Sequence, residues 1–374
     1  MTRRDVQQNQ RALTSRHIPS KHGKASVAST SGSSGEPVKV LRTQKELVAS
    51  RSMFNRFDRW HGFDPARRLA LVLSAPMGGK TGRRMWQFDY WAGVYKYLNI
   101  SAEVECINAQ LPVYEQVDWL EQVRPDYLLV NPRMALELCN EYHRRKSRPT
   151  YELAGIRTFG ETRSPLIDNR IHDTFGVRPL SMYTSEELGH IAIECPGSGN
   201  YHVCDENVLV EVVNSCNRAS DINTPGRLLV TSLHGYAMPR IRYEVGDEAC
   251  KLAPCSCGRP QTLISEIAGR TGNLFQRPDG TRFRPERALL ERAADLMRAR
   301  AIQIAQVGSN EVEVRYQPDI HTSSKPDMQA CRREVQSSLG SELLVNFAQV
   351  NRIPAKRNGK REDFVCELAH CASD

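Results

Sequence analysis

The chain has 374 residues, of which 40% are hydrophobic, 25% charged and 7% aromatic, with 11 Cys and a formal net charge of +8. This length suffices for two domains with cores. No apolar run approaches the roughly 18 residues that cross a bilayer, and the first residues lack the apolar region of a secretory signal. The odd number of Cys favours reduced thiols and a cytoplasmic protein. Lys and Arg are dispersed along the chain, which favours anionic substrates such as nucleotide phosphates over nucleic acid.

Residues 1–29 are polar and basic, which predicts a poorly packed arm or linker. Thr43 and Glu46 then form a T-x-x-E capping pattern that predicts a helix to about Trp60. Apolar runs at 69–75, 103–108, 126–131 and 155–159 predict buried strands. The segments 83–97, 115–123 and 134–146, and one that ends near Phe175, predict helices. Strands that alternate with helices favour a layered α/β domain.

From residue 191 onward the strand-like runs crowd together, which predicts a more antiparallel sheet. The pattern resets near 269–273, and the tail predicts helix, strand, strand, helix and strand at 286–299, 302–307, 311–317, 327–339 and 343–350. We therefore predict an α/β fold with an arm or linker over 1–29, a large layered domain over 30–270 and a small α+β domain over 271–374.

Two segments have the composition of phosphate-binding loops. TSGSSGEP, from Thr30 to Pro37, is typical of a flexible linker. It also suits a loop whose backbone N–H groups and hydroxyls surround phosphate oxygens, since Gly permits positive φ. The second, MGGKT at 77–81, follows a predicted strand and ends in GKT. The first glycine of a Walker pattern would stand at position 74, which is Ser74, so the Walker interpretation is rejected.

Sulfur and imidazole side chains recur in pairs between 195 and 257. Six residues separate Cys195 from His202, and one residue separates Cys255 from Cys257. Two pairs on neighbouring loops predict a tetrahedral zinc site in an insert around 195–257. Cys204 and Cys250 are near enough in sequence to compete as ligands, and buried thiols without a metal remain the alternative.

Several motifs in fixed order resemble the AMP-forming acyl ligases (adenylate-forming superfamily), above all the phenylacetate–CoA ligase-like branch with its capsular-polysaccharide-biosynthesis relatives. TSGSSGEP resembles the family's phosphate loop, and Tyr183–Glu187 its Y-G-x-x-E segment, with Thr184 in place of Gly. RYEVGD carries Asp247, the GR at 269–270 carries Arg270, and RNGKRE carries Lys360. The Cys/His run is particular to this branch. The resemblance extends from about residue 28 to 368.

This resemblance implies that a carboxylic acid attacks ATP to form an acyl-adenylate with release of pyrophosphate, and that a thiol, coenzyme A, then accepts the acyl group. Glu187 would bind Mg²⁺, Tyr183 would stack on adenine and Asp247 would bind the ribose hydroxyls. Arg270 would steady the ribose–phosphate part, and Lys360 would contact the carboxylate and the α-phosphate. The phosphate loop would contribute Thr30, Ser31, Gly32, Ser33, Ser34 and Gly35. The zinc would be structural, since four protein ligands leave no open position.

Two departures from the family pattern leave alternatives open. Gly272 stands at the position about which the small domain swings, where acids or Lys are usual. The segment before the phosphate loop is also short, so we expect an upstream extension or a separate piece to supply a missing front. The alternatives are an adenylating enzyme that passes its acyl group to a carrier protein or an amine, and a zinc-bearing scaffold with little or no activity. The sequence does not name the acid.

Overall fold

The computed structural model describes residues 1–30, 37–73, 83–267, 274–318, 325–351, 353 and 363–368. It divides into two compact units: a large one formed by Met1–Thr30 and Val38–Gly269, and a small one that includes Arg270–Asp374. Among the described residues, no helix is both long enough and apolar enough to span a membrane.

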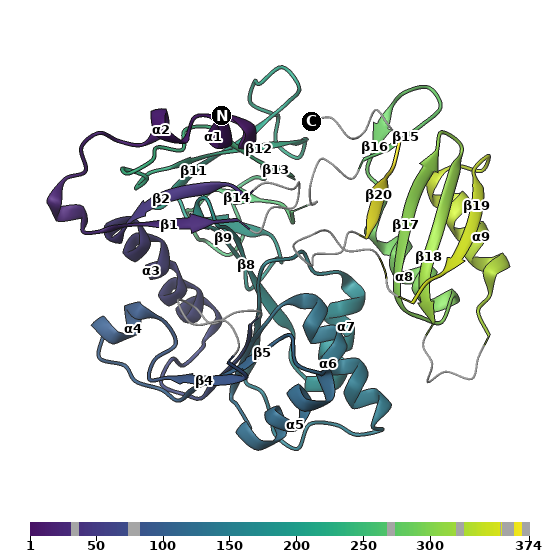
Figure 1. The fold of residues 1–374 in the computed structure, drawn as a ribbon, viewed down its shortest axis with the longest axis horizontal. Helices are drawn as coiled ribbons and strands as arrows, with labels where there is room; N and C mark the ends of the chain where they lie inside the picture. Colours follow the sequence, from purple (N-terminus) through teal and green to yellow (C-terminus); the bar gives the residue numbers. More distant parts are fainter. Residues whose placement is uncertain are drawn as a thin grey trace. The chain divides into compact units, whose positions relative to one another are not determined.

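A nine-stranded sheet organises the described part of the large unit (Figure 1). Its order is β14-β10-β9-β8-β7-β6-β3-β5-β4. The five central strands, β8, β7, β6, β3 and β5, run parallel, and the flanking strands are antiparallel to their neighbours. The strands are β3 (Leu69–Leu73), β4 (Met85–Phe88), β5 (Val104–Asn108), β6 (Tyr127–Val130), β7 (Gly155–Thr158), β8 (Pro179–Ser185), β9 (Gly189–Glu194), β10 (Tyr201–Val203) and β14 (Leu263–Ile264).

Helices cover both faces of the sheet, which explains why its central strands are apolar throughout. On β3, Ala70 and Val72 pack with α5 (Val113–Val123), α6 (Pro132–Arg144) and α7 (Pro165–Phe175). Leu69 and Leu71 point to the other face and pack with α3 (Gln44–His61) and α4 (Gly93–Tyr97). This alternation follows from the two-residue period of a strand. It confirms the layered α/β architecture.

Residues 83–97 differ from the predicted helix. They form strand β4 followed by the short helix α4. Along β4, Trp86 is buried, whereas Met85 and Gln87 are exposed, which is the period of an edge strand. β4 gains its hydrogen bonds only by pairing with β5. This pairing is a tertiary contact, which local composition does not encode. The prediction of a helix over 83–97 was therefore wrong for the residues that form β4.

A second, antiparallel sheet follows, as predicted from the crowded strands. It has the order β11-β12-β13, with β11 at Val208–Val213, β12 at Pro225–Ser232 and β13 at Tyr243–Cys250. The hairpin of β1 (Ala25–Ser29) and β2 (Lys39–Thr43) packs into the apolar core that the second sheet helps to form. Thr43 caps α3 by accepting a hydrogen bond from the Glu46 N–H at 3.2 Å, which confirms the predicted start of that helix.

The first 29 residues are packed, unlike the predicted arm. Helix α1 (Arg3–Gln8) begins with a capping box, and Val6 is fully buried in the core beneath the second sheet. The backbone of Met1 pairs with β13, since its carbonyl accepts from Glu244 N–H at 2.9 Å. Helix α2 (Gln10–Leu13), the 3-10 turn η1 (Ser20–His22) and β1 follow. The few apolar residues of this segment, such as Val6, pack against residues that are distant in sequence. The polar composition of the segment therefore did not predict that it would be packed.

The small unit has its own core and matches the elements predicted for the tail. A four-stranded sheet of order β19-β18-β17-β20 packs with α8 (Arg287–Leu296) and α9 (Met328–Leu339). Its strands are β17 (Ala299–Gly308), β18 (Glu311–Pro318), β19 (Leu344–Gln349) and β20 (Phe364–Cys366). The hairpin of β15 (Phe275–Gln276) and β16 (Arg282–Phe283) was not predicted.

Candidate active site and metal centre

The segment from Tyr183 to Glu187 lies at the carboxyl end of β8 and in the turn to β9. Ser185 pairs with Gly189 across this turn, so the segment is the end of a strand and the turn after it. β8 runs parallel to β7. In open α/β sheets ligands bind beyond the carboxyl ends of the parallel strands. The segment therefore stands where a ligand site is expected.

Two tyrosine–carboxylate hydrogen bonds join this segment to β13. The hydroxyl of Tyr183 donates to Asp247 Oδ2 at 2.6 Å. The hydroxyl of Tyr243 donates to Glu187 Oε1 at 3.0 Å. Glu187 is only 7% exposed, and Tyr243 is buried. The structure thus brings together three predicted residues (Tyr183, Glu187 and Asp247) and adds Tyr243, to which the sequence analysis gave no role.

A buried ion cluster underlies the turn that carries Glu187. Glu46 accepts from Arg42 Nε at 3.2 Å and from Arg240, and all three side chains are buried. Glu187 is close enough to interact electrostatically with Arg240. Gly189, at φ +76°, lies against Arg42 so closely that a Cβ there would be 2.7 Å from Nη2. The buried cluster therefore packs against the turn between β8 and β9.

The remaining predicted nucleotide-site residues lie mostly outside the described part of the chain. Thr30 is described: its Oγ1 accepts from Val38 N–H at 2.9 Å, and its own N–H donates to the Val38 carbonyl at 2.9 Å. These bonds continue the β1–β2 hairpin, so folded elements precede the predicted phosphate loop, contrary to our expectation. The predicted residues outside the described ranges are Ser31, Gly32, Ser33, Ser34, Gly35, Arg270, Gly272 and Lys360.

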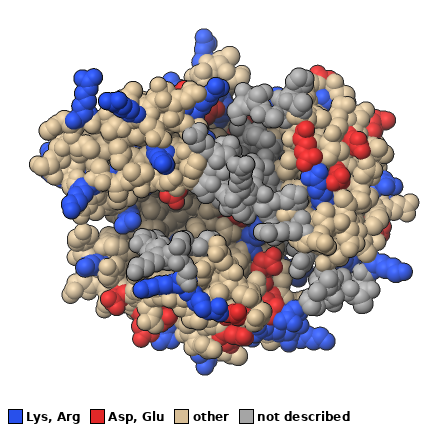
Figure 2. Space-filling view, in the orientation of Figure 1, with Lys and Arg blue, Asp and Glu red and all other residues tan. Residues whose placement is uncertain are grey.

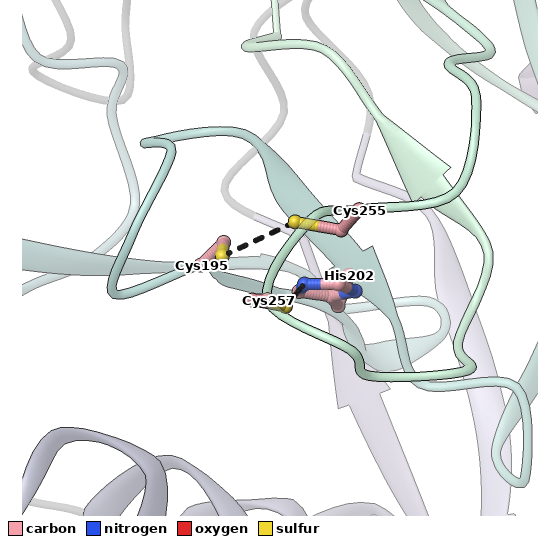
Figure 3. A group of neighbouring side chains, drawn as sticks. All are labelled: Cys195, His202, Cys255 and Cys257. Carbon is pink, nitrogen blue, oxygen red and sulfur yellow. Dashed lines mark hydrogen bonds between the residues drawn. The ribbon is translucent and has the colours of Figure 1, made fainter.

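The four predicted zinc ligands converge in one cluster (Figure 3). Cys195 follows β9, His202 lies in β10, and Cys255 and Cys257 come from the loop between β13 and β14. Their ligand atoms all lie within 4.8 Å of one another. Neither Cys204 nor Cys250 belongs to this group.

The spacing of these atoms fits a tetrahedral ion. Ligands at about 2.3 Å from a central zinc place neighbouring sulfurs about 3.8 Å apart. The Sγ atoms of Cys195 and Cys255 are 3.7 Å apart, and Cys257 Sγ is 3.3 Å from His202 Nε2. Gly258, at φ +77°, closes the turn that presents both cysteines, with its N–H donating to the Cys255 carbonyl. Three sulfurs and one imidazole form a donor set that zinc prefers.

The electrostatics at Cys257 suit a metal ligand. Burial raises its pKa, but hydrogen bonds from the backbone and side chain of Arg259, together with those of the Cys255 and Cys195 thiols, outweigh that effect and bring the pKa to about 6. A backbone hydrogen bond from Cys257 lowers the pKa of Cys255, but burial and its own hydrogen bonds with the Cys257 and Cys195 thiols raise it overall. The thiolate is the form that binds metal. Arg259 also stacks over Trp60, whose ring contacts His202 edge-on. In contrast, burial raises the pKa of Cys204 to about 12, as expected for an unliganded core thiol.

A second buried ion cluster adjoins the metal centre and was missed in the sequence. Glu194, immediately before Cys195, accepts from Arg163 at 3.0 and 3.2 Å and from Arg178 at 3.1 Å. Arg163 comes from the loop after β7 and also binds Asp168 at 2.7 Å. Glu194 stands at the end of the apolar run IAIE, and a buried charge requires a partner of opposite charge. This requirement could have predicted from the sequence that Glu194 pairs with an arginine. The cluster connects the metal centre to the carboxyl end of β7.

On the face shown in Figure 2, the described Lys and Arg side chains lie in several separate groups with Asp and Glu between them. This dispersal agrees with their spread along the sequence.

Comparison with known proteins gives one curated relative and many similar structures. No protein-family model matches the chain. A phenylacetate–coenzyme A ligase from Pseudomonas putida is 26% identical over 166 residues, which are 43% of this chain and 37% of that protein. The matched segment thus spans little more than a third of the relative's length.

Solved structures of adenylate-forming enzymes share the fold. A 2-hydroxyisobutyryl-CoA ligase in the postadenylation state superposes with a TM-score of 0.76 at 17% identity, over 99% of this chain and 80% of that one. The anthranilate CoA ligase AuaEII bound to anthranoyl-AMP has a TM-score of 0.68 at 12% identity, over 91% and 65%. The amide bond synthetase McbA from Marinactinospora thermotolerans has 0.62 at 15%, over 90% and 67%. The chain therefore has the fold of the adenylate-forming ligases, as its motifs predicted.

Proposed function

We propose that this protein activates a carboxylic acid with ATP, releases pyrophosphate and transfers the acyl group from the acyl-adenylate to a thiol, coenzyme A. The observation that carries the proposal is the pairing of Tyr183 with Asp247, 64 residues apart, beside Glu187 at the carboxyl end of β8. The fold shared with CoA ligases and the sequence similarity to a phenylacetate–coenzyme A ligase support it.

Each residue type suits the role that we assign to it. Glu187 offers carboxylate oxygen, the donor that Mg²⁺ prefers. Asp247 accepts hydrogen bonds from the ribose hydroxyls, and Tyr183 offers its ring to adenine. The loop from Thr30 to Gly35 supplies N–H and hydroxyl donors to the departing phosphates. Arg270 steadies the ribose–phosphate part, and Lys360, a point charge on a flexible stem, contacts the carboxylate and the α-phosphate.

We propose that Cys195, His202, Cys255 and Cys257 hold one structural zinc ion. The close approach of their ligand atoms and the donor set of three sulfurs and one imidazole support this assignment. When bound, zinc would cross-link the end of β9 to the loop before β14. We place the protein in the cytoplasm, because none of the described cysteines forms a disulfide.

The acceptor is coenzyme A in the main proposal, and an amine or a carrier protein in the alternative. Structural neighbours include a CoA ligase bound to 2-HIB-AMP and CoA, and an amide bond synthetase. A pyrophosphate-release screen over aromatic and aliphatic acids, with and without coenzyme A, separates these possibilities. Pyrophosphate without a CoA thioester, but with amide formation when amines are supplied, would favour the alternative. No pyrophosphate with any acid would favour a scaffold.

Lys360→Ala tests the adenylation step directly. We expect acyl-adenylate formation to fall about a hundredfold or more, the usual effect of removing one group that stabilises transition-state charge. Thioester formation from supplied acyl-adenylate should stay close to that of the unmodified protein. The measurement is pyrophosphate release in the first half-reaction and thioester yield in the second. Lys325→Ala, a change at an exposed lysine, is the control. Equal losses in both half-reactions would contradict the assigned role.

A further inference from the structure

The two tyrosine–carboxylate hydrogen bonds form a reciprocal pair. In the first segment Tyr183 precedes Glu187 by four residues, and in the second Tyr243 precedes Asp247 by four. Tyr183 donates to the carboxylate of the second segment, and Tyr243 donates to that of the first. Each segment thus holds the carboxylate of the other.

The pair joins two sheets that share no ladder. β8 belongs to the nine-stranded sheet and β13 to the three-stranded sheet. Backbone hydrogen bonds connect the sheets at the far end of β13, where Ser265 N–H donates to the Cys250 carbonyl at 2.9 Å. Beside Glu187 and Asp247, the two tyrosine hydroxyls make the connection. A hydroxyl that donates to a carboxylate makes a charge-assisted bond, which is stronger than a neutral one. A carboxylate has about four lone-pair sites, so the bond from Tyr243 restricts the orientation of the Glu187 carboxylate without using all of its acceptor sites.

Tyr243 is buried, whereas Tyr183 is only partly buried. The Tyr243 ring lies 2% exposed in the core cluster with Val230 and Ala249, so it does not face solvent. Its hydroxyl emerges from this apolar core at Glu187 Oε1. Packing would be served equally by phenylalanine, whereas a buried hydroxyl in a core is tolerated when it is hydrogen-bonded. The hydroxyl therefore makes a contact that the ring by itself would not supply.

We propose that Tyr243 is a positioning residue that holds the Glu187 carboxylate for a divalent cation, and that the reciprocal pair couples cation binding to nucleotide binding across the two sheets. The proposal deepens, and rests on, the function proposed above. When the pair is intact, the cation and the ribose meet carboxylates that are already oriented. Less side-chain entropy is then lost when either ligand binds.

The test is Tyr243→Phe, which removes one oxygen and retains the ring. We expect the Mg²⁺ concentration for half-maximal pyrophosphate release to rise about tenfold, the usual order for one charge-assisted hydrogen bond. At saturating Mg²⁺ the kcat should return to within about twofold of the unmodified value. The KM for the acid should not change. Tyr201→Phe is the matched control, because Tyr201 is buried in the same core cluster as Tyr243. It should leave the Mg²⁺ requirement unchanged.

Mn²⁺ binding in the presence of ATP, followed by electron paramagnetic resonance, is a readout independent of turnover. Tyr243→Phe should weaken Mn²⁺ binding, and the loss in Tyr183→Phe/Tyr243→Phe should differ from the sum of the single losses. If the unmodified chain binds Mn²⁺ with ATP but releases no pyrophosphate, the proposed function fails while the positioning role stands. An unchanged Mn²⁺ affinity in Tyr243→Phe, a kcat loss that Mg²⁺ does not restore, or no Mn²⁺ binding by the unmodified chain would each overturn the positioning role.

Discussion

Cys255→Ser combined with Cys257→Ser is expected to abolish zinc binding and destabilise the large unit. The expected size follows from linkage: free zinc at a thousandfold its Kd stabilises a folded site by about 4 kcal/mol. For a domain of this size that corresponds to a Tm change of about 8–16 °C. The unmodified protein should therefore melt at temperatures that rise with buffered free zinc, and the double variant should melt at a constant, lower temperature. Elemental analysis should find one zinc per unmodified chain.

Cys250→Ser is the control for this experiment. Cys250 was a competing ligand in the sequence, but it lies outside the cluster of four. It should retain one zinc per chain and the zinc-dependent Tm. Purified protein without zinc, or a Tm that ignores free zinc, would remove the metal from the proposal. Loss of zinc in Cys250→Ser would show that the ligand set is wrong.

Arg240→Met should cost the large unit about 3–5 kcal/mol, the usual penalty for removing one partner of a buried ion pair. Arg240 is fully buried, and its guanidinium contacts Glu46, the Met238 carbonyl and Ser232. Methionine retains much of the length of the side chain, but it removes the donor to the Met238 carbonyl and leaves Glu46 with Arg42 as its cation. Denaturant unfolding at fixed pH measures the free energy.

Arg242→Met is the matched control, two residues along the same connection. The Arg242 side chain is half-exposed and pairs with Glu211 at 3.3 Å. An exposed pair contributes about 0–1 kcal/mol, so this variant should be close to the unmodified protein. Equal stability of Arg240→Met and Arg242→Met would show that the buried cluster does not stabilise the fold. Gly189→Ala should also destabilise, since its Cβ would lie 2.1 Å from Ser50 Oγ.

The local sequence pattern was sufficient to predict those elements that depend only on neighbouring residues. The run LALVL predicted β3 because a central parallel strand is apolar on both faces. Thr43 predicted the start of α3 because an N-cap acts within one turn. The proposed zinc ligands Cys195, His202, Cys255 and Cys257 could be chosen from the sequence because metal-binding chemistry is specific to residue type, and the structure brings these four together.

Other features depend on contacts between distant segments, and no local pattern encodes them. β4 is a strand because β5 offers it an edge. Val6 is buried because the second sheet leaves a place for α1. Motif order alone predicted Glu187 and Asp247 as site residues. Only the tertiary structure placed Tyr243 beside Glu187 and closed the reciprocal pair, because a hydrogen bond between residues 56 positions apart exists only after both sheets have formed.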